Sequence, residues 1–128
     1  MKRLILLVLP LAASGCLFAA AGAGAGGGIY FFDRGVGSVV TAPVAKASSA
    51  TQQTFQEMGI NQKKTSTQQE GDKDKREIDG ATADRDVTVT IQTEGTGSRV
   101  LVVVRKSAVT WDKDFAKKIL NRIVELAK

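Results

Sequence analysis

The chain has 128 residues, a formal net charge of +5, no histidine and one cysteine. This length suits one small domain, and the interspersed charges lack the basic block that is typical of nucleic-acid-binding proteins. Without histidine the chain cannot form Ser-His or Cys-His nucleophile pairs, and a lone cysteine allows neither an internal disulfide nor a thiolate zinc cluster.

The N-terminal stretch has the layout of an export signal. A basic start is followed by an apolar run over residues 4–11 and then by Ala13-Ser14-Gly15 directly before Cys16. This three-part order is typical of a secretory signal peptide. The last four residues also resemble the lipobox of bacterial lipoproteins, with Ala13 at the position where leucine is more common. We therefore predict that residues 1–15 are a cleaved signal peptide and that Cys16 is lipidated.

Two other interpretations of this stretch stay open. An ordinary secretory signal could precede an incidental cysteine, or the uncharged residues 4–32 could form an uncleaved single-pass membrane helix. However, Pro10 interrupts the first half of this stretch, and residues 19–28 consist of alanine and glycine. Such residues have little transfer free energy into a bilayer, and glycine is a poor helix former.

Residues 16–28 are expected to be the lipidated cysteine and an Ala/Gly-rich tether. A glycine-rich coil as long as residues 22–28 spans only about 15 Å, so the folded domain would stay close to the membrane. The residue after the cysteine is Leu17, whereas an aspartate there favours inner-membrane retention in enteric bacteria. By this resemblance we expect an anchor in the outer membrane that faces the periplasm.

A single folded domain is expected over residues 29–128, because the composition changes at Ile29, after the alanine and glycine run. In chain order we first predict an extended segment over residues 29–32 and 35–41, which is broken or bulged around Gly35 and Gly37. A helix over 44–58, strands over 60–69, 76–83, 87–92 and 100–104, and a helix over 112–127 are expected to follow.

The first helix has the clearest boundaries. Pro43 suits a first helical turn, Gly59 suits a helix end, and apolar residues at steps of three and four form one thin stripe with Phe55 as its anchor. The strand that follows is polar and rich in threonine. Its two lysines, Lys63 and Lys64, discourage unwanted pairing, so we expect this strand at an edge of the sheet.

The second half of the domain has the strongest strand pattern. Apolar and polar residues alternate over 87–92, so one face of that strand is buried. Residues 100–104 are apolar at every position, as in a strand that is covered on both faces or carries an exposed apolar strip. Asp112 or Thr110 can cap the last helix, and Trp111 is expected to pack at its entry as a lid on the core.

These elements predict an α+β fold. Strands joined by short turns pair antiparallel, because a parallel return needs a crossover of a dozen or more residues. Each helix has one apolar face, so both should lie on the same side of the sheet. The expected architecture is a two-layer sandwich of order β-α-β-β-β-β-α, with a mainly antiparallel five-stranded sheet and both helices on one face.

Several short motifs are spread along the chain: Ala13-Ser14-Gly15-Cys16, the Ala/Gly run into Ile29-Tyr30, Thr41-Ala42-Pro43, Met58-Gly59-Ile60, and a valine strand followed by Trp111-Asp112. On these motifs the whole chain resembles a family of small bacterial lipoproteins that is known as a domain of unknown function. The resemblance implies a lipid anchor and one small domain. It implies no activity, because the family has none established, and it brings no site residues.

The residues favour a non-catalytic interaction or structural module of the cell envelope, whose partner is another envelope protein or a second copy. If helices cover only one face of the sheet, Leu101 and Val103 could form an apolar strip on the other face, and such strips mark interfaces. The alternative is that residues 29–40 help to cover that face. We expect no cofactor, no metal and no nucleic-acid partner.

The sequence leaves three other functions open. Acidic residues near the turns could serve a hydrolase or bind calcium: Asp72, Asp74, Glu77, Asp79, Asp84 and Asp86. They are interleaved with lysine and arginine, which favours a solvated, charge-balanced loop, and their spacing differs from an EF-hand. A lipid or hydrophobic-ligand site between the sheet and the helices is the third alternative, since the thin stripe of the first helix would permit a cavity.

Overall fold

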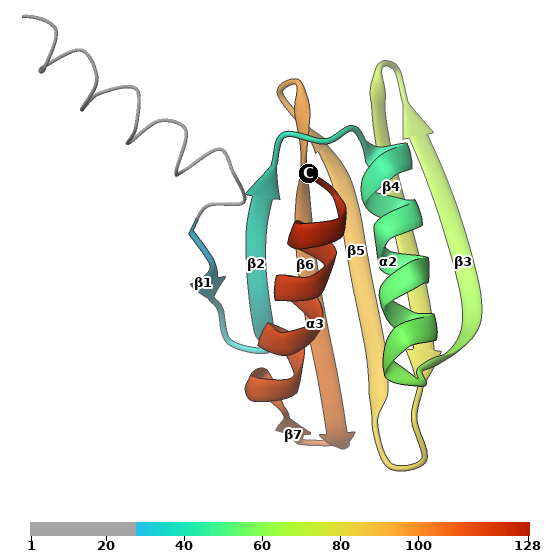
Figure 1. Ribbon diagram of the computed structural model, residues 1–128, viewed down its shortest axis with the longest axis vertical. Helices are drawn as coiled ribbons and strands as arrows, with labels where there is room; N and C mark the ends of the chain where they lie inside the picture. The colour runs from blue at the N-terminus through green and yellow to red at the C-terminus, as the bar shows by residue number, and fades with distance from the viewer. Residues whose placement is uncertain (1–27) are drawn as a thin grey trace, which may run out of the picture.

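The computed structural model describes residues 28–128 (Figure 1), so the predicted signal peptide, Cys16 and all of the tether except its last residue lie outside the described residues. The elements are β1 (Tyr30–Phe31), β2 (Gly35–Val40), α2 (Val44–Met58), β3 (Asn61–Glu70), β4 (Lys73–Ala81), β5 (Asp86–Glu94), β6 (Gly97–Ser107), β7 (Thr110–Trp111) and α3 (Lys113–Leu126). No helix of residues 28–128 is long and apolar enough to cross a bilayer.

All strands belong to one antiparallel sheet, which confirms the α+β prediction. The strand order is β1-β2-β6-β5-β4-β3, and β7 pairs with the C-terminal end of β6. The predicted count of five strands is wrong, because residues 28–128 form a sheet of seven strands. Phe32 and Gly35 exchange backbone hydrogen bonds of 2.9 and 3.3 Å, which turns the chain back so that β1 and β2 are separate strands.

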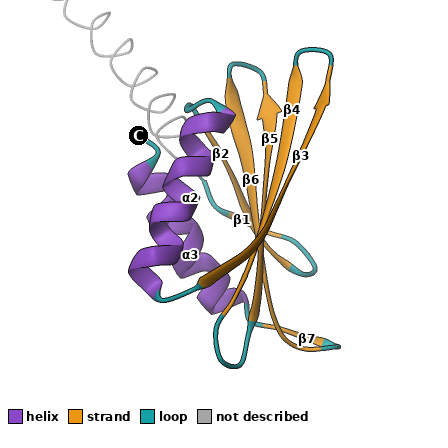
Figure 2. Ribbon diagram, turned by 90° about the vertical axis from the view of Figure 1, so that its right-hand side faces the viewer, coloured by secondary structure: helices purple, strands orange, loops and turns teal. Residues whose placement is uncertain are grey.

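The two helices lie on one side of the sheet (Figure 2) and divide it between them. Helix α3 packs on β2 and β6, whereas α2 packs mainly on β4 and β5, and the helices also contact each other. The sequence did not predict which strands each helix covers. Because α2 reaches only partly toward β3, the side chains of that outer strand are almost all exposed.

The core lies between the sheet and the helices and follows the period of each element. On β5 and β6, alternate residues are at most 1 % exposed: Val87, Val89, Ile91, Val100, Val102 and Val104. They face Phe55 of α2 and the apolar stripe of α3, which includes Ile119, Leu120 and Ile123. The predicted alternation over residues 87–92 is therefore confirmed, since residues two apart on a strand share a face.

Helix α2 ends as its sequence predicts. Gly59 has the left-handed φ of 69°, and its N–H donates to carbonyls of the last turn, which satisfies backbone groups that would otherwise lack a partner. Two buried threonines on the inner face satisfy their hydroxyls within the helix, because Thr51 donates to the Ala47 carbonyl at 2.9 Å and Thr54 to the Ala50 carbonyl at 2.8 Å. These bonds allow a thin, partly polar stripe to be buried.

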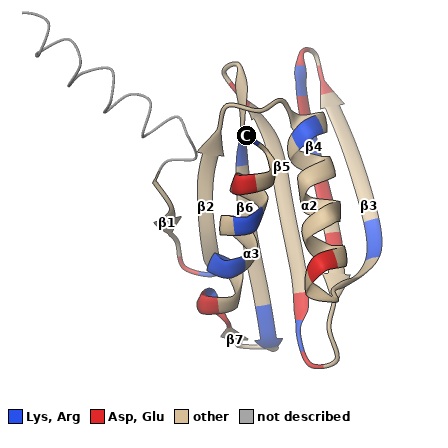
Figure 3. Cartoon of the chain, viewed as in Figure 1, with Lys and Arg blue, Asp and Glu red and all other residues tan. Residues whose placement is uncertain are grey.

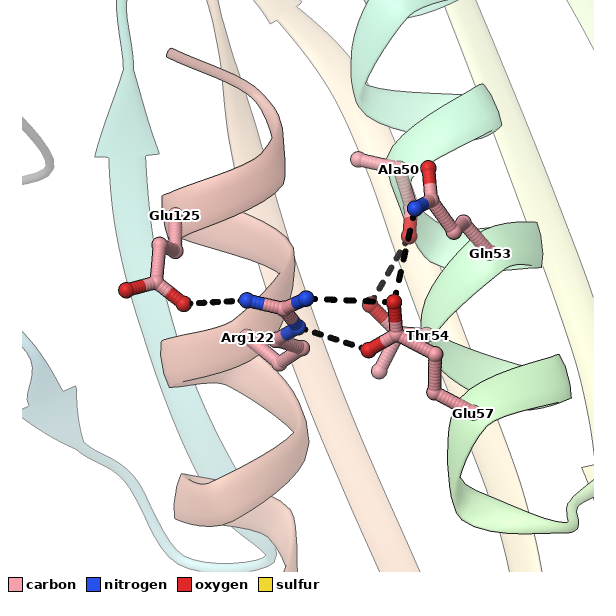
Figure 4. A network of polar contacts seen from close by, with 6 residues as sticks. All are labelled: Ala50, Gln53, Thr54, Glu57, Arg122 and Glu125. Carbon is pink, nitrogen blue, oxygen red and sulfur yellow. Dashed lines mark hydrogen bonds and ion pairs between the residues drawn. The ribbon is translucent and has the colours of Figure 1, made fainter.

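A network of polar contacts joins the two helices near the solvent (Figure 4). The Arg122 guanidinium donates to both carboxylate oxygens of Glu57, at 2.7 and 3.1 Å, and also pairs with Glu125. The hydrogen bonds from Arg122 lower the pKa of Glu57, and those to the two carboxylates raise the pKa of Arg122. Each side chain is more than a third exposed, so water screens the pairs and they contribute little to stability.

The predicted role of Trp111 as a core lid is wrong. Trp111 belongs to β7, where it lies opposite Arg105 of β6, and residues directly opposite each other share a face of the sheet. Arg105 is in step with Leu101 and Val103, on the face away from the helices. Trp111 therefore lies outside the core, and Phe115 packs against the core near the entry of α3.

Candidate binding face

The face of the sheet opposite the helices is the most distinctive surface of the domain, and we call it the open face. In the part of the chain that the structure describes, no helix lies on it (Figure 2). Leu101 and Val103 both point to this face, because Val100, Val102 and Val104 between them are buried on the helix side. Both are half-buried. Both residues therefore lie on the side of the sheet away from the helices, and residues of the segment 29–40 cover them in part.

Tyr30 of β1 lies against Leu101 at the edge of the open face. Tyr30 is paired with Gly37, and a Cβ atom at Gly37 would come within 2.6 Å of Leu101 Cδ2 and 2.7 Å of the Tyr30 ring. Glycine at this position therefore makes the room in which Tyr30 packs on the sheet. The ring is 37 % exposed, so it covers part of Leu101 and still presents a surface to a partner.

Arg99 fixes the position of this tyrosine. Its Nη1 donates to the Tyr30 hydroxyl at 3.0 Å, its Nε donates to Glu94 at 3.1 Å, and its guanidinium carbon lies 6.0 Å from the centre of the Tyr30 ring. Hydrogen bonds from Arg99 lower the pKa of Glu94, and the bonds to Glu94 and Tyr30 raise the pKa of Arg99. The aromatic ring is thus held by a charged group rather than left to rotate in solvent.

A hollow of about 530 Å³ extends from this tyrosine across the upper part of the open face. Tyr30, Phe32 and Leu101 line one side, and polar residues of the β3–β4 and β5–β6 hairpins line the other. Both signs of charge occur at the hairpin tips (Figure 3), so the hollow has no strong preference for an anion or a cation. It lies on the open face, whereas the sequence allows a ligand cavity between the sheet and the helices.

Val103 continues the apolar strip toward the opposite end of the sheet. Its neighbours across the strands are Gly35 and Thr88, and a Cβ at Gly35 would lie 3.1 Å from Val103 Cγ2. Further along, the Arg34 guanidinium carbon lies 5.8 Å from the centre of the Trp111 ring. The open face therefore carries two pairs of an aromatic ring and an arginine, one on each side of Leu101 and Val103.

The structure does not gather the acidic candidates into one site. Asp72 and Asp74 lie at the β3–β4 hairpin, whereas Asp84 and Asp86 lie at the other end of β4 and beside Arg85, which forms an ion pair with Asp84 at 2.9 Å. Among residues 28–128 there is no group of three or more acidic or cysteine side chains that could hold a metal ion.

Tyr30, Arg99, Arg34 and Trp111 were not predicted as parts of a surface. The pairs come from residues far apart in the sequence, so only the pairing of β1 and β7 with their neighbours brings them together. Gly37 was the one local signal, because a glycine within an apolar strand often marks a close approach of other atoms.

Comparison with known proteins gives a family and no further relatives. A family model described as "Protein of unknown function (DUF3568)" matches residues 1–125. No curated protein and no solved structure matches the chain.

Proposed function

The chain belongs to the DUF3568 family of proteins of unknown function, and on that premise we propose that it is a non-catalytic binding module that is anchored in the bacterial cell envelope by a lipid on Cys16. The observation that carries this proposal is the open face. Its apolar and aromatic side chains stay partly accessible because no described helix covers them. The expected address is the outer membrane, facing the periplasm.

The anchor is supported by the order of parts in the sequence. The small residues before Cys16 resemble a lipobox, and alanine and glycine then lead to Gly28, two residues before Tyr30. The two ends of a flexible glycine-rich coil lie close together for the number of residues between them, so a lipid on Cys16 would hold the open face near the membrane. An ordinary secreted domain would not need a tether at this place.

Metabolic labelling with palmitate tests the anchor. We expect the wild-type chain to take up the label and to sediment with the membrane fraction, and we expect Cys16→Ala to lose the label because it removes the thiol that is acylated. Cys16→Ser is the matched control for shape and should lose the label as well. Labelling that persists in both variants would contradict the lipid anchor.

The composition of the open face favours a protein partner. Tyrosine, tryptophan and arginine are enriched in protein interfaces, where they contribute much of the binding energy. Here Tyr30 and Trp111 are each held beside an arginine, and Leu101 and Val103 lie between them. The strip is thus an apolar patch with a polar rim. Burying it in an interface would stabilise a complex by roughly 25 cal/mol per Å² of apolar surface.

Replacing Leu101 and Val103 together by threonine tests this face. A photoreactive amino acid at Thr90, which is paired with Leu101, is expected to give a defined adduct in intact cells. The double variant should reduce that adduct at least about tenfold, since both substitutions remove apolar contact at the centre of the patch. Threonine is β-branched and suits a strand, so the fold is expected to persist, and circular dichroism checks it.

The matched control is Val109→Thr, which changes an apolar residue that is 77 % exposed and lies in the β6–β7 turn. This variant should leave the adduct unchanged. Full retention of the adduct in the double variant would show that the partner does not bind through Leu101 and Val103.

A further inference from the structure

Strand β3 forms a free edge of the sheet, which is a second surface distinct from the open face. It is the last strand in the order, so among the described residues nothing pairs with its outer side (Figure 1). Nine of its ten residues are exposed and one is half-buried. It contains no proline, and an unpaired row of backbone N–H and C=O groups is a template for another strand.

The regular part of this edge is limited to residues 64–70. The register with β4 shifts between Gln62 and Lys64, so Lys63 sits in a bulge, and pairing is then continuous from Lys64 opposite Asp79 to Glu70 opposite Lys73. A bulge bends a strand and interrupts its ladder. A second strand can therefore pair smoothly only with this regular part, whose midpoint is Thr67.

We propose that two copies of this chain associate by antiparallel pairing of β3 with β3, about a twofold axis at Thr67. This register uses the whole regular part of both edges. It places Lys64 opposite the partner's Glu70, and by symmetry Glu70 opposite the partner's Lys64. In this arrangement the remaining opposed residues are uncharged: Thr65 with Gln69, Ser66 with Gln68, and Thr67 with its own copy.

Charge supports a second copy as the occupant of this edge. The regular part has a cation at its start, an anion at its end and uncharged residues between them, so it is complementary to itself when read antiparallel. Lys64 and Glu70 lie on the same face of the sheet, since they are an even number of residues apart. Opposite charges placed directly across two strands stabilise the pairing, and like charges destabilise it.

Lys64 and the length of the regular part disfavour other registers. A twofold axis at Lys64 would place Lys64 against its own copy. An axis nearer to Glu70 would shorten the overlap between the two regular parts, so ladder hydrogen bonds would be lost. The sequence interpretation assigned Lys63 and Lys64 to the prevention of pairing. In the proposed dimer Lys64 instead selects one register, and only Lys63, in the bulge, keeps the protective role.

The proposed pairing would place both open faces on the same side. A twofold axis perpendicular to the sheet continues it from one copy to the other, with all helices on the opposite side. The dimer therefore leaves Leu101 and Val103 accessible in both copies. For this reason the pairing of β3 and the binding function of the open face can fail independently.

Charge exchange at Lys64 and Glu70 tests the pairing. The full chain, in a density-matched detergent at one protein molecule or fewer per micelle, is examined by sedimentation velocity. We expect the wild type to dimerise, and we expect Lys64→Glu and Glu70→Lys each to weaken the dimer at least about tenfold, because each single variant places like charges at both ends of the pairing.

Restoration makes the test specific. The double variant Lys64→Glu/Glu70→Lys should dimerise like the wild type, and an equimolar mixture of the two single variants should also form dimers, since opposite charges then face each other again. Lys63→Glu is the matched control and should change little, because Lys63 lies in the bulge. These residues are exposed, so folding is expected to persist.

Any of three results would overturn the proposal: a monomeric wild type, dimers that persist equally in both single variants, or a mixture and double variant that stay monomeric. The adduct formed at the open face is measured on the same variants. An adduct that persists in a monomeric variant would show that the open face functions without the pairing of β3.

Discussion

Replacing Phe55 with alanine is expected to lower the free energy of unfolding by about 3–5 kcal/mol, the usual cost of removing a buried aromatic side chain. Phe55 is 1 % exposed. Its ring lies directly over Gly80 of β4, because a Cβ atom added to that glycine would come within 2.7 Å of the ring and 2.8 Å of Ile60. Gly80 itself has no side chain that could fill the space left by the ring, so a cavity is expected at this position.

The measurement is urea unfolding followed by far-ultraviolet circular dichroism. A small domain typically has 5–15 kcal/mol of stability in total, so this variant is expected to be close to unfolded at 37 °C. Phe31→Ala is the matched control, since Phe31 is 54 % exposed and should change the free energy of unfolding by only about 0.5 kcal/mol. Similar losses for the two variants would mean that Phe55 does not anchor α2.

The second large effect is expected at Asp112, where alanine should lower the free energy of unfolding by about 1–2 kcal/mol. Asp112 caps α3: its Oδ1 accepts from the Phe115 N–H at 3.0 Å, and its Oδ2 accepts from Arg85 Nε at 2.7 Å. Its side chain is only 13 % exposed, so the carboxylate also connects the β4–β5 turn to the start of the helix. Asp112→Asn keeps a cap oxygen and removes the charge, which separates the two contributions.

The pH dependence of this difference has a definite sign. The hydrogen bond from the Phe115 N–H, followed by that from Arg85, lowers the pKa of Asp112 below its ordinary value of 3.8. The stabilisation is therefore complete above about pH 4–5 and is lost as the pH falls through 3.8 toward the lower folded-state pKa. Unfolding curves of the wild type and Asp112→Asn should converge in acid. A difference that grows as the pH falls would contradict this assignment.

The secondary structure was largely predictable where one period dominates. The helix over residues 44–58 matches α2, because Pro43 and Gly59 mark its ends and its stripe has a helical period. The alternation over residues 87–92 likewise marks the buried face of β5. Asp112 was one of two predicted caps, and its contact with Phe115 confirms it.

Pairing between distant segments was not predictable in the same way. The two-residue strands β1 and β7 carry too few positions to show a period, so the extended segment was expected as one strand and Trp111 as a lid on the core. Strand β1 forms because it can pair with the backbone of β2 at Gly37, and β7 forms because it can pair with the backbone of β6 at Arg105.

By itself the sequence determined the order of the two helices and the five longer strands, the buried faces of α2, β5 and α3, and the resemblance of residues 13–16 to a lipid-anchor signal, because each of these depends on neighbours along the chain. Only the tertiary structure decided which face of the sheet stays open. A strand that is apolar at every position, such as residues 100–104, fits either a covered or an accessible face. The packing of α2 and α3 on one side resolves this. The pairing of β1 and β7 with their neighbouring strands then places Tyr30 and Trp111 on either side of Leu101 and Val103, which no local pattern in the sequence shows.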